Sequence, residues 1–284
     1  MLWIFKNDPI FKNSVKPRPV EEILNIQIFR PLAHILLIAI KDTKIKPETI
    51  VITHTFLVLS ASVLIFYSQS LILDLIAFLK LQLKTILDNL DGQLARYKNQ
   101  QSTLGRYLDT LMDYLGNLFL FTVIGIKHNL LPLSLISFYT LTIVLSYDYN
   151  LERLYKEKNK KSDTLQFNNN EHNNLCKLLS KLYEFLLGYQ DKSIYWLEEN
   201  IFKKIDKTNK YTHVFWNKNY LNLTVNMGLT TQLFILGILI LLNKESLYLY
   251  FPFICLLLIK LMLVYRIIVT YKEVRKHGKN SNNS

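Results

Sequence analysis

Four aspartates lie at fixed spacing inside an otherwise apolar stretch of this 284-residue chain. Asp88 and Asp91 are three positions apart, and Asp109 and Asp113 are four positions apart. Either spacing places both members of a pair on one face of a helix. If the two helices pack as a hairpin, four negative charges converge on a small volume. At about 4 Å and an effective dielectric constant of about 20, each like-charge pair costs roughly 4 kcal/mol.

Such a cluster persists only if protons or cations neutralise it. Ligand sets made only of oxygen suit hard cations, so magnesium or manganese is the expected partner. Aspartates on a solvated helix face would need no such partner, but the apolar neighbours of these four favour a functional cluster. The spacing therefore predicts a site for divalent cations formed by the four aspartates.

Further residues are fixed around the aspartates between positions 88 and 113. The run DNLDGQLAR is followed, after eight residues, by GRYLDTLMD. This pattern, D-x2-D-G-x2-A-R-x8-G-x3-D-x3-D, resembles the signature of the class I CDP-alcohol phosphatidyltransferases. The resemblance implies an integral membrane enzyme of phospholipid biosynthesis. Such an enzyme transfers a phosphatidyl or phospho-alcohol group from a CDP-activated donor to an alcohol acceptor and releases CMP.

The sequence does not identify the donor or the acceptor of the implied enzyme. CDP-diacylglycerol is favoured as the donor over a soluble CDP-alcohol, and the acceptor alcohol is not specified. A weaker resemblance over residues 86–114 is to the branch with inositol-phosphate-coupling enzymes, whose product would be a soluble phosphodiester. The family resemblance also implies a homodimer in the lipid bilayer.

The resemblance assigns roles within the motif. Asp88, Asp91 and Asp109 would hold two divalent ions, Mg²⁺ or Mn²⁺, against the pyrophosphate of the donor. Asp113, a further metal ligand, would accept the proton of the alcohol as general base. Contacts to the donor would come from Gly92, Ala95, Arg96, Ser102 and Gly105. Ser102 has an alternative role as a plain helix N-cap.

A cation- or proton-coupled transporter is the main alternative from another class, because carboxylates inside a membrane also mark ion pathways. A transporter has no need for Gly92, Arg96 and Gly105 at these spacings, and its halves are commonly repeated. We find no internal repeat in the sequence. The motif therefore favours the enzyme.

Composition and hydropathy place the motif in a membrane. The chain is 50% hydrophobic and 20% charged, which fits a membrane domain with a polar insertion. The net charge of +12 points to anionic lipid headgroups rather than nucleic acid.

The predicted fold is an all-α polytopic membrane bundle of six transmembrane helices, preceded by an N-terminal juxtamembrane amphipathic helix. Apolar stretches of about 20 residues can cross about 30 Å of hydrocarbon. They fall near 48–68, 71–96, 102–127, 131–150, 220–242 and 247–270. Lysine and arginine gather on one side of this arrangement, while the opposite side keeps only Lys127 and Lys244. In a multi-pass cell-membrane protein, this asymmetry places the motif and both termini in the cytoplasm.

The same pattern divides the chain into four parts. Residues 1–47 form a lead-in, irregular over 1–20, and the amphipathic helix over 21–41. Residues 48–150 form the first four spans, residues 151–215 a cytosolic helical insertion, and residues 216–284 the last two spans with a basic tail.

The insertion has two interpretations. Residues 156–161 and 168–170 predict a solvated linker, and leucines then recur at helical spacing from Leu175 to Leu186. This helical part is either a cytosolic hairpin packed on the membrane domain or a basic amphipathic flap on the bilayer surface.

Polar residues outside the motif also carry alternatives. Lys80 and Lys84 continue the aspartate face and are expected to point into the bundle, either to neutralise the acids or to bind an anionic acceptor. A polar stripe begins the fifth span, for interhelical hydrogen bonds or for an acceptor pocket: Asn219, Asn222, Asn226 and Thr230. The six histidines are scattered and form no pattern of metal ligands.

Overall fold

The structure is a computed structural model that describes residue 5, residues 7–159 and residues 174–280. Helices and their connections make up this part of the chain, and it contains no strand. The predicted all-α class is confirmed.

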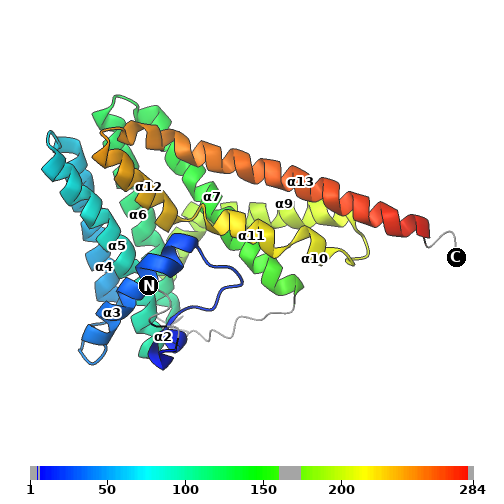
Figure 1. Cartoon of the computed structure of the whole chain (residues 1–284), viewed down its shortest axis with the longest axis horizontal. Coiled ribbons are helices and arrows are strands. Elements are labelled where there is room, and N and C mark those ends of the chain that lie inside the picture. The colour runs from blue at the N-terminus through cyan, green and yellow to red at the C-terminus, as the bar shows by residue number, and fades with distance from the viewer. Residues whose placement is uncertain (1–4, 6, 160–173, 281–284) are drawn as a thin grey trace.

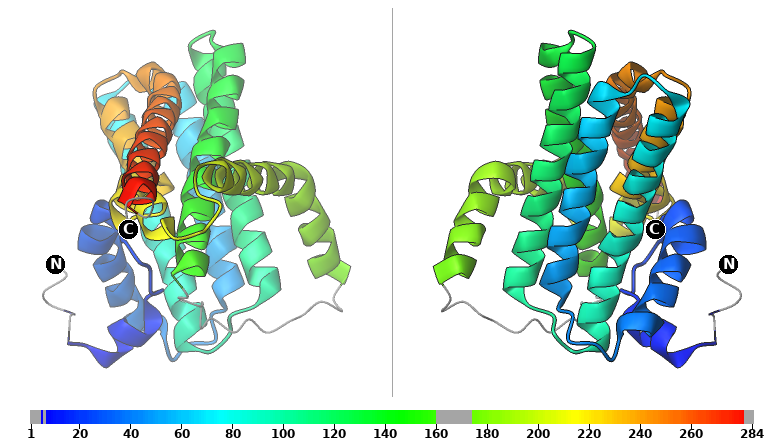
Figure 2. Two further views of the ribbon diagram at one scale, coloured as in Figure 1. Left: turned by 90° about the vertical axis from the view of Figure 1, so that its right-hand side faces the viewer. Right: turned by 90° about the vertical axis from the view of Figure 1, so that its left-hand side faces the viewer.

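The bundle is built from four long helices that follow one another: α4 (Pro47–Tyr67), α5 (Leu71–Tyr97), α6 (Thr103–Lys127) and α7 (Leu131–Lys158). Their connections are short, so successive helices run antiparallel and lie side by side (Figure 2). Helix α4 packs against both α5 and α6, and α6 packs against α7. This arrangement places α4 across the α5–α6 hairpin that carries the motif.

Two further segments complete the bundle. Helix α11 (Lys218–Val225) leads into α12 (Leu229–Leu241), and the turn η3 (Glu245–Tyr250) leads into the long α13 (Phe251–Asn280). Helix α12 packs on α5, while α13 packs on α7 (Figure 1). The predicted fifth span over 220–242 is therefore not one straight helix. At the break, a Cβ on Gly228 would lie 2.9 Å from the Val225 carbonyl oxygen, so only glycine fits there.

Among the described residues, five segments are long and apolar enough to cross a membrane: α4, α6, α7, Thr212–Leu241 and Glu245–Lys276. They indicate a multi-pass membrane protein. The predicted second span, α5, is long enough at 27 residues but is not apolar enough, because charged side chains interrupt it from Asp74 to Arg96. The count of six spans is therefore not confirmed by hydropathy.

The N-terminal region packs beside the C-terminal end of α5. Helix α2 (Pro9–Ser14) lies within the stretch predicted to be irregular, so that expectation is wrong over these residues. Asp8 caps this helix by accepting a hydrogen bond from the Ile10 amide at 2.8 Å, and a hydrogen bond with His34 lowers the pKa of its carboxyl. The amphipathic helix predicted over 21–41 is present as η1 (Asn25–Phe29) and α3 (Arg30–Ile40).

The insertion is helical where it is described. It contains α8 (Asn174–Tyr183), η2 (Glu184–Gly188), α9 (Tyr189–Ile205) and α10 (Thr212–Phe215). Helix α7 continues through Lys158, past the predicted boundary at residue 150. Most of the predicted solvated linker, including residues 168–170, lies outside the described residues.

A buried ion pair fastens the insertion to the last helix. The guanidinium of Arg266 on α13 donates to both carboxylate oxygens of Glu198 on α9, at 3.1 and 2.6 Å. Its Nε atom donates to the Phe215 carbonyl oxygen at 2.9 Å. Both charged side chains are fully buried, so each depends on the other for its stability.

We expect Arg266→Met to lower the free energy of unfolding by about 3–5 kcal/mol, because it leaves the Glu198 carboxylate buried and unpaired. Thermal unfolding of the detergent-purified protein measures this change. The double variant Arg266→Met/Glu198→Leu removes both charges and should recover most of the loss. Lys203→Met, which breaks a largely exposed pair with Glu199, is the control and should change little. Wild-type stability of Arg266→Met would contradict this role.

Candidate metal centre

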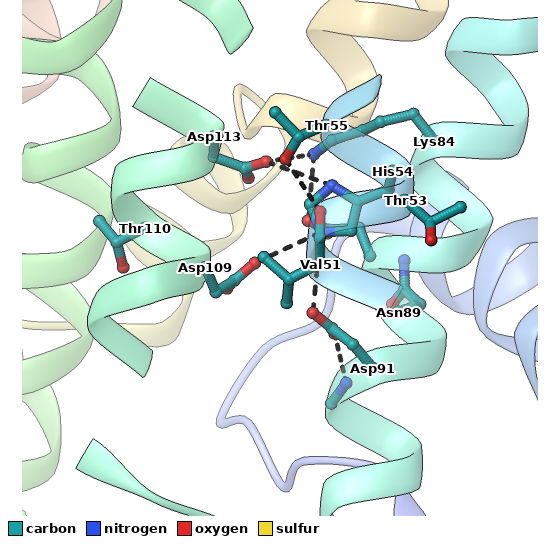
Figure 3. A network of polar contacts seen from close by, with 12 residues as sticks. Val51, Thr53, His54, Thr55, Lys84, Asn89, Asp91, Asp109, Thr110 and Asp113 are labelled. Carbon is teal, nitrogen blue, oxygen red and sulfur yellow. Dashed lines mark hydrogen bonds and ion pairs between the residues drawn. The ribbon is translucent and has the colours of Figure 1, made fainter. Parts of the chain in front are cut away.

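Two neighbouring helices bring the predicted aspartates together, and a third adds a histidine (Figure 3). Asp88 and Asp91 lie on α5, and Asp109 and Asp113 lie on the first turns of α6. The predicted hairpin between these two helices is present, so the two pairs face each other. Helix α4 adds a fifth residue, His54, which lies between the pairs.

The imidazole of His54 points into the space between the carboxylates. Its Nε2 atom lies 3.7 Å from Asp91 Oδ2 and 3.6 Å from Asp109 Oδ1, and its Nδ1 atom lies 4.0 Å from Asp113 Oδ1. These separations are longer than hydrogen bonds. The ring is fully buried, yet neither nitrogen has a hydrogen-bond partner within the described chain. An unsatisfied buried polar group costs about 1–3 kcal/mol. A bound metal ion would remove this cost by taking one of the ring nitrogens as a ligand.

The cluster fits a divalent cation. One ligand atom from each of four residues lies within 4.8 Å of the others: His54, Asp88, Asp109 and Asp113. Ions such as Mg²⁺ bind ligands at about 2.0–2.1 Å, so two ligands of one ion lie at most about 4.2 Å apart. The 3.6 Å between His54 Nε2 and Asp109 Oδ1 falls within this limit. The carboxylate oxygens suit magnesium or manganese, whereas the imidazole nitrogen is a ligand more typical of transition-metal ions.

Asp91 lies at the edge of this group. Its Oδ1 atom accepts a hydrogen bond from the Gly92 amide, and its Oδ2 atom faces His54. It is therefore close to the predicted site but outside the tightest set of four ligand atoms.

Lys84 supplies positive charge from within the bundle. Its Nζ atom lies 3.0 Å from Asp88 Oδ1 and 2.7 Å from Asp113 Oδ1, and its side chain is only 2% exposed. The prediction that Lys84 points into the bundle is confirmed, and its contacts support the neutralising role. Lys80 also points inward, but it donates to Ser60 Oγ at 2.9 Å instead of meeting the acids.

The ammonium of Lys84 neutralises only part of the negative charge of the aspartates, so the cluster can still bind a cation. Lys84 makes ion pairs with Asp88 and Asp113, whereas Asp109 faces the imidazole of His54 at 3.6 Å. The Asp109 side chain is 41% exposed, so an ion can reach the cluster from this side.

The residues predicted to contact the donor surround the turn between α5 and α6. Ser102 Oγ accepts a hydrogen bond from the Gly105 amide at 3.0 Å, so the role of Ser102 as N-cap is confirmed. A Cβ on Gly105 would lie 3.1 Å from that hydroxyl oxygen and 3.8 Å from Glu48 Oε1. A side chain at position 105 would therefore contact the Ser102 hydroxyl.

The other three predicted donor residues lie on the last turns of α5. A Cβ on Gly92 would lie 3.1 Å from Nη2 of Arg96, one turn away. The Nε atom of Arg96 donates to the Ser14 carbonyl oxygen, which ties the N-terminal region to this end of the helix. Ala95 is half-buried beside them. Their role in donor binding stays a prediction.

The polar stripe predicted at the start of the fifth span reaches only from Asn219 to Asn226, because the helix breaks between Val225 and Leu229. Asn219 and Asn222 are exposed, whereas Thr230 is buried. Asn226, at the break, accepts a hydrogen bond from the Ile23 amide at 3.0 Å.

His54 is the one member of the cluster that the sequence analysis missed. It has no neighbouring histidine or cysteine in the sequence, because the ligand set is assembled from three helices. The sequence position of His54, inside the apolar span 48–68, is a signal that could have identified it. An ionisable residue in the middle of an apolar span faces the bundle interior by default and marks a functional site.

Fold and site together define the class of protein: a multi-pass helical membrane protein with a carboxylate–imidazole cluster that can hold a metal ion. Residues 44–164, which contain α4 to α7 and the whole cluster, match the family model of CDP-alcohol phosphatidyltransferase. Over this region the chain is similar to this family, whose members are phosphotransferase enzymes. No match to the chain was found among curated proteins.

We expect Lys84→Met to make stability depend on divalent cations. Without the ammonium, Asp88 and Asp113 lose their close counter-charge, so the melting temperature in EDTA should fall by several degrees. Mg²⁺ should restore it, because a ligand that binds only the folded state stabilises that state. The same Mg²⁺ addition should shift the wild type less. Lys80→Met, whose ammonium contacts Ser60 instead of the acids, is the matched control. An equal Mg²⁺ response in Lys84→Met and wild type would rule out the neutralising role.

Proposed function

We propose that the protein is a metal-dependent CDP-alcohol phosphatidyltransferase of phospholipid biosynthesis. It transfers a phosphatidyl group from CDP-diacylglycerol to an alcohol and releases CMP. The observation that carries this proposal is the convergence of the four motif aspartates with the unpaired, buried imidazole of His54. Because the family is one of phosphotransferases, the transporter alternative loses its support. The homodimer implied by the family resemblance stays a prediction.

The membrane arrangement that we propose has six spans: the five apolar segments and α5. At 27 residues, α5 is long enough to cross about 30 Å of hydrocarbon. Its central charges do not face lipid: Lys84 meets Asp88 and Asp113, and Lys80 meets Ser60. Six spans place both termini, the carboxylate cluster and the insertion at the cytoplasmic side, in agreement with the positive-inside rule.

The depth of the cluster supports a lipid donor. Asp113 lies about 21 Å along α6 from Lys127 at the far end, at about 1.5 Å per residue. It is thus inside a hydrocarbon layer about 30 Å thick. A donor anchored by acyl chains brings its pyrophosphate to this depth while its tails remain in lipid. This favours CDP-diacylglycerol over a soluble CDP-alcohol.

The residues of the cluster divide the chemistry among them. Asp88, Asp91, Asp109 and His54 would hold the divalent ions, with Asp113 as a further ligand. The ions would supply positive charge for the pyrophosphate and for CMP as the leaving group. The alcohol oxygen forms a bond to the phosphorus that carries the diacylglycerol, and the bond from that phosphorus to the CMP oxygen breaks. Asp113 accepts the proton of the alcohol.

Other residues position these groups. Lys84, at 2.7 Å, orients the Asp113 carboxylate. Arg96 binds a phosphate of the donor through charge-assisted hydrogen bonds. Gly92, Ala95, Ser102 and Gly105 shape the turn against which the nucleotide lies.

Two near-isosteric variants separate these roles. Asp113→Asn should lower CMP release by about 10²–10⁴-fold, the cost typical of losing a general base, while retaining most of the nucleotide binding. Asp91→Asn should weaken binding of both metal and CDP-diacylglycerol, because it removes a ligand. CMP release and equilibrium binding of CDP-diacylglycerol, measured on detergent-purified protein with a panel of alcohols that includes inositol phosphate, test both.

Asp42→Asn is the control for these variants, since Asp42 is 83% exposed on the loop before α4. Near-normal turnover by Asp113→Asn would refute its assignment as the base.

The proposed orientation is tested by labelling. A cysteine introduced at Ser162, within the insertion, should resist a membrane-impermeant maleimide in intact cells and react after permeabilisation. A cysteine at Asn129, in the loop between α6 and α7, should show the opposite pattern. Labelling of the Ser162 variant from outside would overturn the six-span topology.

A further inference from the structure

The insertion after α7 presents an apolar edge that nothing in the described chain covers. From Asn174 to Ile205, α8, η2 and α9 form one continuous helical stretch that bends at η2 (Figure 2). Large apolar side chains on this stretch are 41–77% exposed: Leu175, Leu178, Leu182, Phe185, Tyr189 and Trp196. Most of them recur every three or four residues, so they form a stripe along one face of the helix.

The other faces of α8 have different surroundings. On the inner face, Cys176 is buried against Thr103, and the Tyr183 ring lies 5.4 Å from the Tyr107 ring. Helix α8 therefore packs on the first turns of α6, beside the metal cluster. On the outer face, Lys177 and Lys181 are exposed. The apolar stripe runs between a protein contact and a row of lysines.

Hydrogen bonds to α7 fix the position of the bend at η2 along the bundle. Asp191, at the start of α9, accepts hydrogen bonds from Ser146 and Asn150 of α7 and from the Tyr183 hydroxyl. Ser146 lies about 22 Å along α7 from Leu131, at about 1.5 Å per residue. That is nearly the distance of Asp113 from the same end of the bundle. In a layer about 30 Å thick, the bend is level with hydrocarbon on the side of the carboxylate cluster.

We propose that α8, η2 and α9 form a lipid-binding element in the leaflet that contains the carboxylate cluster. Leu182, Phe185 and Tyr189 enter the acyl chains at the bend. Trp196 lies at the interface, where amphipathic aromatic rings are favoured. Lys177 and Lys181 extend to the headgroups. This inference goes beyond the proposed reaction and requires only that α6 and α7 span the bilayer.

A cytosolic hairpin, the alternative, would leave these side chains in water. Each fully exposed large apolar side chain forgoes about 1.5–3 kcal/mol of burial, and contiguous exposed patches mark binding sites. The lysines beside the stripe match a membrane surface, since anionic headgroups attract basic residues. The bilayer is thus the occupant that fits both the depth and the charge of the edge.

Spin labels on single cysteines test the depth of the element in phosphatidylcholine nanodiscs. In a Cys176→Ala/Cys255→Ala background, a label at Phe185→Cys should collide with oxygen, which concentrates in lipid, more than with a water-soluble nickel chelate. Its pattern should match that of Leu115→Cys, on the exposed face of α6. A label at Lys177→Cys should instead be more accessible to the chelate, as at Asp42→Cys. A Phe185 label that matches Asp42 would overturn the proposal.

Fluorescence provides a second measurement without cysteine substitutions. Brominated lipids quench tryptophan within the bilayer, and Trp216 is buried in the protein, whereas Trp196 is 66% exposed. In a Trp3→Phe background, quenching should therefore fall markedly when Trp196→Phe is added. Equal quenching in the two proteins would place Trp196 in water and contradict the proposal. Both measurements are independent of turnover, so they succeed or fail separately from the enzymatic assignment.

Discussion

Mutual repulsion of four carboxylates in a space of low dielectric constant governs the arrangement around the motif. Helices α5 and α6 cannot place two aspartate pairs face to face without positive charge between them. Lys84 supplies part of it by contacting Asp88 and Asp113, while the imidazole of His54 enters from α4. The unpaired ring nitrogens and the exposed side of Asp109 show where a further cation is accommodated. Packing of α4 across the hairpin is what completes the site.

Segments outside the bundle attach near the same end of the molecule (Figure 1). The N-terminal region binds Arg96 through the Ser14 carbonyl oxygen, and Glu22 caps α12 by accepting from the Thr231 amide at 2.7 Å. The insertion attaches through Asp191 to α7 and through Glu198 to α13. In a membrane protein such polar contacts concentrate where water and headgroups are near. The contact to Arg96 lies on the same helix as Asp88 and Asp91, at the end of α5 that carries the motif.

Hydropathy and the motif predicted much of this arrangement. Helices α4 and α6 match the predicted spans to within a residue or two, because apolar composition and proline or serine at the N-terminus fix their limits. The facing of the two aspartate pairs followed from helical spacing and a short turn.

Other features depend on contacts that no local pattern encodes. His54 joins the cluster only because α4 crosses the hairpin, and a lone histidine in an apolar span has no local partner in the sequence. The break at Gly228 is set by the close approach to the Val225 carbonyl oxygen. Helix α2 is stabilised by its cap at Asp8 and by packing on His34, which composition alone does not show.

The central claim is that this cluster acts through divalent cations on a CDP-activated lipid. The most direct test is CMP release from CDP-diacylglycerol by detergent-purified protein, measured before chelation, in excess EDTA, and after Mg²⁺ or Mn²⁺ is restored. The account predicts that release stops in EDTA and returns with either ion in the wild type, and that Asp109→Asn requires a higher ion concentration. Undiminished release in excess EDTA would contradict the assignment of the carboxylate–imidazole cluster as a catalytic metal centre.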